Sequence, residues 1–171
     1  MLKSVLAWIL ASTAVTIAHA DCTDRDKTDC PPIRQLITFE AVAITAGPYG
    51  EMWELKYAAN DELHLKVDYM ISPQGDLSGK FLVSSENLEG LRTAVREQRF
   101  FELPKSIAPP ALPFHAPDLR LRISLGDRTH LVQLYAPDSL SSNPEAARFL
   151  AVWKAVFALV PMQPTWKARG R

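Results

Sequence analysis

The segment DELHLKVDY, residues 61–69, gathers the residue types that metal sites and acid–base catalysts use. If it forms a β-strand, Glu62 and His64 point to the same side about 7 Å apart, a spacing that permits two ligands of a metal site. The pattern supplies no third ligand. In a hairpin with the preceding strand, Lys56 lies opposite His64 and repels a bound cation. We therefore favour a charged, solvent-exposed strand surface over a metal site or an acid–base pair.

Two further histidines lie close to acidic residues in the second half of the chain. His115 precedes Asp118 by three positions, and this pair, or His64 with a nearby acid, would suit a small hydrolase that uses a histidine–carboxylate pair. His130 is expected to pack on the apolar side of a hairpin. No G-x-S-x-G or H-E-x-x-H motif occurs. We therefore assign no catalytic residue, metal ligand or cofactor, and the hydrolase is the alternative function.

A proline-rich segment, residues 104–117, holds five of the 13 prolines of the chain. Proline removes a backbone donor and fixes φ, so the segment is expected to be a long, stiff loop without regular structure. Apolar side chains displayed among prolines can dock into a groove on a partner. Alternatively, Phe114 folds back onto the edge of the core. The candidate binding residues are Pro109, Pro110, Leu112, Phe114 and His115.

The first 20 residues predict an export signal. Lys3 provides a positive start, an apolar stretch follows, and Ala18-His19-Ala20 forms a cleavage site. No later apolar run reaches the roughly 20 residues that span a bilayer. We therefore expect a periplasmic or secreted protein without stable membrane insertion after cleavage.

Both cysteines of the chain, Cys22 and Cys30, follow the cleavage site within residues 21–33. In an exported protein two such neighbours favour a disulfide bond. Lipid attachment at Cys22 is the alternative, but Asp21 stands where a lipoprotein has a small residue.

The charge balance argues against nucleic acid as a ligand. The chain has 19 basic and 19 acidic residues, and signal cleavage would remove Lys3 and no acid. A chain so close to neutrality has no net field to attract a polyanion. The expected partner is another envelope protein or a peptide, and the expected role is that of a binding protein, of which an inhibitor or accessory protein is one form.

Alternation of apolar and polar residues predicts four strands before the proline-rich segment. They cover residues 34–45, 51–58, 62–71 and 80–84, with turns at 47–50 and 72–79. Pairing of the second and third strands places Tyr57, Leu55 and Trp53 opposite Leu63, Leu65 and Val67, and Glu54 and Lys56 opposite Lys66 and His64.

Two helices and a second hairpin complete the predicted elements. The first helix is capped by Ser85, buries Leu88, Leu91 and Val95, and stops at Pro104. In the hairpin, a turn at Gly126-Asp127 pairs Leu119, Leu121, Ile123 and Leu125 with Leu134, Val132, His130 and Arg128.

The second helix is predicted from the motif SNPE, with Asn143 as the cap and Pro144 in the first helical position. It ends at Pro161, before a basic tail at 162–171. Its buried residues are expected to be Phe149, Trp153, Val156, Phe157 and Val160.

The predicted order ββββ-α-ββ-α indicates an α+β fold. Short links between strands favour a largely antiparallel sheet, and both helices are expected to pack on one face of it. Residues 34–161 are predicted to form a single domain.

Two motifs carry a resemblance to a known group of proteins. Phe100-Phe101 ends the first helix, and His130 to Tyr135, HLVQLY, forms an H-x-V-x-x-Y-like strand after a glycine turn. Over roughly residues 63–161 the chain resembles a group of small exported bacterial α+β domains of unassigned function. The resemblance implies this fold and a location in the cell envelope, and it carries over no catalytic residue.

Overall fold

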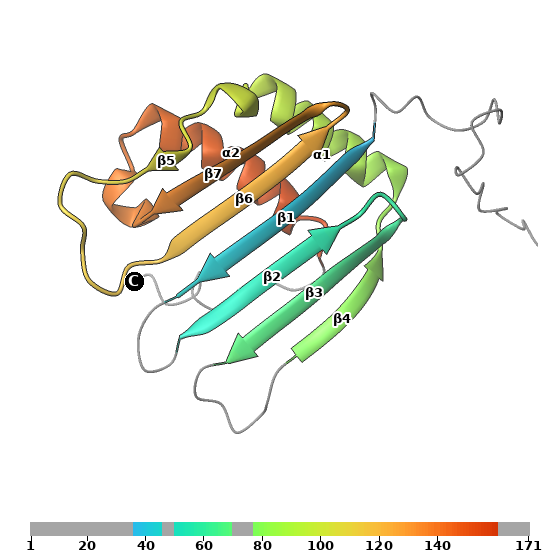
Figure 1. The fold of residues 1–171 in the computed structure, drawn as a ribbon, viewed down its shortest axis with the longest axis horizontal. Helices are drawn as coiled ribbons and strands as arrows, with labels where there is room; N and C mark the ends of the chain where they lie inside the picture. The colour runs from blue at the N-terminus through green and yellow to red at the C-terminus, as the bar shows by residue number, and fades with distance from the viewer. Residues whose placement is uncertain (1–35, 46–49, 70–76, 161–171) are drawn as a thin grey trace, which may run out of the picture. The chain divides into compact units, whose positions relative to one another are not determined.

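A seven-stranded sheet in the order β4-β3-β2-β1-β6-β7-β5 organises the molecule (Figure 1). The computed structural model describes residues 36–45, 50–69 and 77–160, within the unit Pro32–Arg171. The predicted export signal, the predicted disulfide between Cys22 and Cys30 and the basic tail lie outside the described residues. The strands are β1 (Ile37–Ile44), β2 (Glu51–Tyr57), β3 (Glu62–Tyr69), β4 (Leu77–Leu82), β5 (Ser106–Ile107), β6 (Asp118–Leu125) and β7 (Arg128–Tyr135).

Strand β1 joins the two halves of the sheet, because it pairs antiparallel with both β2 and β6. The pairs β2–β3, β3–β4 and β6–β7 are also antiparallel, and β5 pairs parallel with β7. The predicted α+β fold with a largely antiparallel sheet is therefore confirmed.

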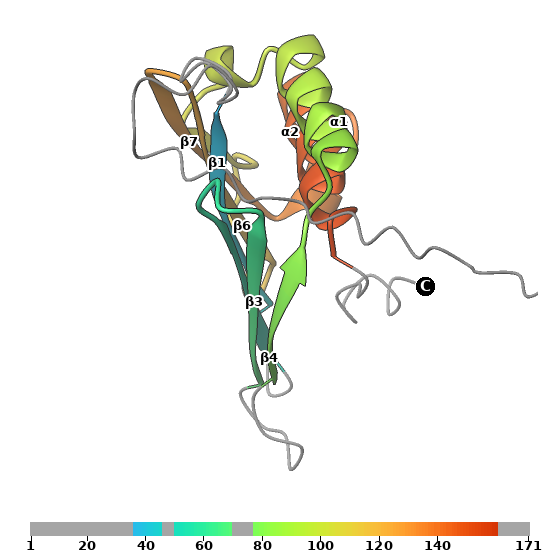
Figure 2. The ribbon, with the colours of Figure 1, turned by 90° about the vertical axis from the view of Figure 1, so that its right-hand side faces the viewer.

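Both helices, α1 (Ser85–Glu97) and α2 (Pro144–Phe157), lie on the same side of the sheet, as the edge-on view shows (Figure 2). Helix α1 carries the chain from β4 at one edge of the sheet towards β5 at the other. We call the covered side the inner face and the opposite side the outer face. Because side chains alternate along a strand, each strand supplies apolar residues to the inner face and mostly polar residues to the outer face.

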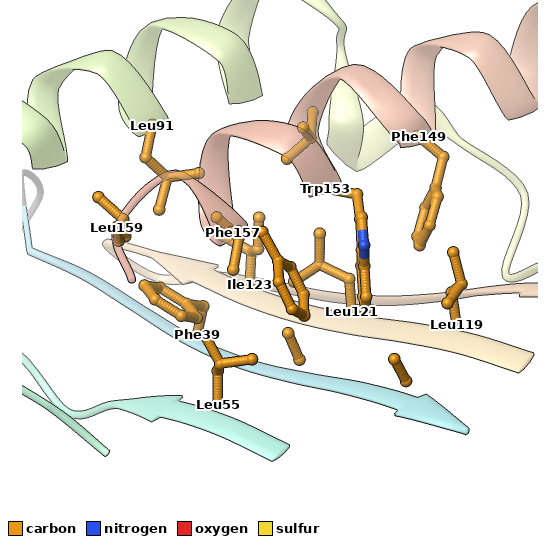
Figure 3. Packing of buried hydrophobic residues seen from close by; sticks show 14 of the residues in the cluster. Phe39, Leu55, Leu91, Leu119, Leu121, Ile123, Phe149, Trp153, Phe157 and Leu159 are labelled. Carbon is orange, nitrogen blue, oxygen red and sulfur yellow. The ribbon is translucent and has the colours of Figure 1, made fainter. Parts of the chain in front are cut away.

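The core between helices and sheet is rich in aromatic rings (Figure 3). On α2, the rings of Phe149 and Trp153 stack with centroids 5.8 Å apart, and those of Trp153 and Phe157 with centroids 4.8 Å apart. Trp53 of β2 contacts Phe157 from the sheet side, with the centroids 6.3 Å apart. Burial of each such ring contributes about 1.5–3 kcal/mol, so this cluster is a main source of stability.

The predicted strand registers are confirmed. Because the register fixes which residues share a face, the alternation seen in the sequence also identifies the inner face correctly. Strands β2 and β3 pair Tyr57, Leu55 and Trp53 with Leu63, Leu65 and Val67, and β6 and β7 pair Leu119, Leu121, Ile123 and Leu125 with Leu134, Val132, His130 and Arg128.

Helix α2 begins as predicted. Asn143 Oδ1 accepts hydrogen bonds from the backbone N–H groups of Glu145 and Ala146, both at 2.9 Å, and Pro144 takes the first helical position. The predicted end at Pro161 is wrong, since the helix ends at Phe157. Val160 is buried as expected, but it lies beyond the helix.

Helix α1 differs from the prediction at both ends. Its cap is Ser84 and not Ser85, because Ser84 Oγ accepts the N–H of Asn87 at 3.2 Å. The helix ends at Glu97, well before Pro104. Arg148 of α2 binds the end of α1, donating from Nε to the carbonyl of Gln98 at 2.8 Å and from Nη2 to that of Arg99 at 2.9 Å.

The start of one strand and the presence of another also differ from the prediction. Strand β4 begins at Leu77, so residues 77–79, predicted as part of a turn, belong to the sheet. The proline-rich segment contains the short strand β5, contrary to the expectation that it holds no regular structure. The N–H of Gln133 in β7 donates to the carbonyl of Lys105 at 2.9 Å, which holds this strand against the sheet.

Candidate functional site

Strand β3 places the charged side chains of the segment 61–69 on the outer face of the sheet. His64 lies opposite Lys56 of β2, as predicted, and opposite Lys80 of β4 on its other side. Glu62 Oε2 lies 3.4 Å from His64 Nε2 and 3.2 Å from Lys80 Nζ. The carboxylate of Glu62 is therefore shared between an imidazole and an ammonium group.

The neighbouring lysines of the outer face are also paired with acids. Lys56 Nζ lies 3.6 Å from Glu40 Oε1 and 3.7 Å from Glu54 Oε1, and Lys66 Nζ lies 2.8 Å from Asp68 Oδ1. Such exposed pairs contribute roughly 0–1 kcal/mol each. The favoured interpretation of DELHLKVDY as a charged, solvent-exposed strand surface is confirmed. We call the ion-paired residues of the outer face the charged row: Glu40, Glu54, Lys56, Glu62, His64, Lys66, Asp68 and Lys80.

The charged row borders an open depression of about 580 Å³. Its lining includes Lys56, His64, Lys66, Ser78 and Lys80. Within the described residues, no group of three His, Cys, Asp or Glu side chains is placed to hold a metal ion. In the same part of the chain, no serine hydroxyl is hydrogen-bonded to His64. The depression thus brings together three lysines, the His64 imidazole and the Glu54 carboxylate.

His130 packs on the inner face at the open edge of β7, as predicted. Its Nε2 lies 2.8 Å from the carbonyl oxygen of Leu103, and because a carbonyl only accepts, Nε2 carries the proton. The ring also meets Phe100 and Phe101, with centroids 5.8 Å and 6.4 Å away. These contacts make His130 a structural residue that ties β7 to the turn after α1.

Asp118, which belongs to the alternative His115–Asp118 pair, is hydrogen-bonded to residues of the sheet. Its Oδ2 accepts from Nε and Nη2 of Arg120 at 3.0 Å and 2.6 Å, and its Oδ1 accepts from Nε2 of Gln133 at 2.9 Å. Both carboxylate oxygens are thus occupied by neighbours on the sheet. His115 lies exposed on the connection between β5 and β6, in the left-handed region with φ 59°.

The connection between β5 and β6, residues 108–117, is fixed to the sheet at two points. We call it the proline loop. Tyr135 Oη donates to the carbonyl of Pro113 at 2.7 Å, and the backbone N–H of Ala136 donates to that of Pro117 at 2.9 Å. Both anchors lie at the end of β7, so the middle of the loop and its return to β6 are held in place.

The proline loop displays two apolar side chains to solvent. Phe114 is 93% exposed and Leu112 is 65% exposed. The alternative in which Phe114 folds back onto the core is therefore wrong. Of the other candidate binding residues, Pro110 and His115 are exposed and Pro109 is half-buried. The predicted set thus lies on one anchored loop, with Phe114 as its most exposed member.

The anchor of the loop could not be read from the predicted binding residues. Tyr135 ends the H-x-V-x-x-Y-like strand. This strand returns towards the proline-rich segment, and the phenol of Tyr135 is the signal in the sequence for a contact there. The register of β6 and β7 places it opposite Asp118, where the loop ends. Because Val132 and Leu134 of β7 point to the inner face, the next residue, Tyr135, points to the outer face, where it can reach the loop.

A comparison with known protein families and with curated proteins finds no match for this chain. Neither helix of the described residues has the length and apolar character needed to cross a membrane.

Proposed function

We propose that this chain is an exported, non-catalytic binding protein that docks another envelope protein or a peptide through the proline loop. Export rests on the signal predicted at residues 1–20 and on the cleavage site at Ala20. The absence of a recognisable catalytic motif in the sequence favours binding over hydrolysis.

The observation that carries the proposal is the position of Phe114, which is 93% exposed on a loop held by Tyr135. Transfer of a phenylalanine side chain from water into an apolar pocket is favourable by about 1.5–3 kcal/mol. The flanking prolines and the Tyr135 hydrogen bond restrict the loop before binding, which reduces the entropy that binding would cost. An aromatic side chain on a preorganised loop is typical of a binding hot spot.

The surface beside the loop indicates what the partner should carry. A depression of about 510 Å³ lies beside β7. It is lined by Arg120, Thr129, Leu131 and Gln133 of the outer face, together with Lys105 and His130. Lys105 of this lining stands three residues before the proline loop begins. Its basic and partly apolar lining favours a partner whose apolar pocket is bordered by acidic residues.

Site-specific photo-crosslinking in cells that export the protein tests this proposal. A photoreactive phenylalanine analogue placed at position 114 should capture the partner, whereas the same analogue at position 66, in the charged row, should not. With the captured protein purified, Phe114→Ala should weaken binding at least about tenfold. Lys66→Ala serves as the matched control and should bind like the wild type.

Two results would reject the loop as the binding site. One is equal capture of the same protein from positions 114 and 66. The other is an unchanged dissociation constant for Phe114→Ala, with the fold of the variant verified by circular dichroism.

A further inference from the structure

The two edges of the sheet are built differently. At one edge, β5 has only two residues, with prolines at 104 and 109 on either side, which is a common way to prevent further strand pairing. At the other edge, β4 has six residues and no proline. Within the described residues, β4 pairs only with β3. Leu82 of β4 is 81% exposed.

The backbone hydrogen bonds show which groups of β4 face the open edge. The N–H of Val83 donates to the carbonyl of Asp61 at 3.0 Å, so this pair is a hydrogen-bonded pair of the β3–β4 ladder. Such pairs alternate along antiparallel strands. The N–H and C=O groups of Gly79 and Phe81 therefore point towards β3, and those of Ser78, Lys80 and Leu82 point away from it.

We propose that β4 pairs antiparallel with β4 of a second copy of this chain, across a two-fold axis at Gly79. Only registers in which Ser78, Lys80 or Leu82 of one copy lies opposite another member of this set join the outward backbone groups of both copies. These registers also place like faces together, so the helices of both copies lie on the same side of one continuous sheet. With the axis at Gly79, the joined residues are Ser78 and Lys80.

Side chains favour the axis at Gly79 over the axis at Lys80. With the axis at Gly79, Lys80 lies opposite Ser78 of the second copy, and Leu77 lies opposite Phe81 on the inner face. With the axis at Lys80, the two lysines lie directly opposite and repel each other. The alternation of Leu77, Gly79 and Phe81 is thus self-complementary about Gly79.

Gly79 itself suits a position on the axis. A side-chain carbon at position 79 would come within 3.2 Å of Phe81 Cζ, because the Phe81 ring already covers the glycine. Two glycines facing each other leave space for the two Phe81 rings beside them. A larger residue at this position would push the rings away from the inner face.

This pairing is independent of the proposed loop function. Strand β4 and the proline loop lie at opposite edges of the sheet, since the loop follows β5. One molecule could therefore pair through β4 and dock a partner through Phe114 at the same time. Failure of either proposal leaves the other unaffected.

Sedimentation equilibrium of the mature chain over a wide concentration range tests the pairing. The wild type should form dimers. Ser78→Lys should weaken the dimer about tenfold, because two symmetry-related lysine pairs arise, and Ser78→Glu should strengthen it by a similar factor. The double variant Ser78→Lys with Lys80→Glu should restore dimerisation. Matched variants on the other edge, Ser106→Lys and Ser106→Glu, should leave it unchanged.

Amide hydrogen exchange of the wild type gives a readout that needs no variant. As the concentration rises, exchange at Ser78 and Lys80 should slow, while Gly79 and Phe81 should be protected throughout. A chain that stays monomeric at millimolar concentration overturns the proposal and leaves the edge to an extended segment of another protein. A dimer that does not respond to the charge at position 78 overturns it as well.

Discussion

The charged row and the proline loop occupy the two halves of the same sheet, and their side chains are satisfied in opposite ways. In the charged row, His64 and its neighbouring lysines have acidic partners within the chain, from Glu40 to Asp68. On the proline loop, Phe114 lies in solvent although the backbone beneath it is anchored. Residues that look chemically active in the sequence can thus be ion-paired with their neighbours, whereas a segment that looks irregular can present an exposed apolar side chain.

The largest expected effect comes from the inner face and sets the scale for this comparison. Trp153→Ala should lower the free energy of unfolding by about 3–5 kcal/mol, because it removes a fully buried ring that stacks on Phe149 and Phe157. Urea denaturation followed by circular dichroism measures the change. A loss below about 1 kcal/mol would mean that α2 does not pack on the sheet through this ring.

Tyr135→Phe sharpens the comparison by freeing the loop without altering its apolar side chains. It removes the hydrogen bond from Oη to the carbonyl of Pro113, so the free energy of unfolding should fall by about 0.5–1.5 kcal/mol. Amide exchange in residues 111–116 should become faster, and binding through Phe114 should weaken. If exchange in the loop is unchanged, Tyr135 is not its anchor.

Tyr57 tests the inner face through pH. Burial of the phenol raises the pKa of Tyr57, and the nearby Asp61 carboxylate adds to the rise. The folded chain therefore keeps this proton at pH values where the unfolded chain loses it. Its contribution to stability is complete below the ordinary tyrosine pKa of about 10 and is lost as pH rises through the folded value.

The corresponding measurement compares unfolding free energies of the wild type and Tyr57→Phe at neutral and alkaline pH. Above about pH 10 the wild type should lose stability more steeply than the variant, which lacks the ionisable group. Parallel pH profiles for the two proteins would show that burial does not hold the proton on Tyr57.

Substitutions in the charged row should have small effects. His64→Ala should change the free energy of unfolding by less than about 1 kcal/mol, because its pair with Glu62 is exposed and Glu62 keeps Lys80. Lys56→Ala, which removes contacts to Glu40 and Glu54, is the companion variant. If His64→Ala instead abolishes the biological activity while the fold is intact, the row is a functional site and the hydrolase regains support.

Much of the fold follows from local patterns in the sequence. Period-two alternation and the short loops together predict both hairpin registers. A one-residue slip would move Leu55 or Leu65 to the outer face, and the length of the loop excludes a two-residue slip. Asn143-Pro144 gives the start of α2, because a cap and a proline act within one turn. The cap of α1 is missed by one residue, since Ser84 and Ser85 are equivalent in sequence and only the hydrogen bond to Asn87 distinguishes them.

What the sequence misses depends on distant contacts. Strand β5 exists because Gln133 binds the carbonyl of Lys105, and no local pattern in a proline-rich segment predicts a parallel pairing. The start of β4 at Leu77 is missed because Gly79 interrupts the apolar alternation in the sequence. In the structure, the pairing of Gly79 with Leu65 continues the strand through this position. The exposure of Phe114 depends on the anchor at Tyr135, which brings together residues 22 positions apart.

Equilibrium unfolding of Phe114→Ala tests whether the Phe114 side chain lies in solvent, where a partner can reach it, or in the core of its own chain. We expect a change in the free energy of unfolding within about 0.5 kcal/mol of zero, as for a side chain that contacts only solvent. A loss of about 3–5 kcal/mol, typical of a buried phenylalanine, would contradict it and place Phe114 in the core.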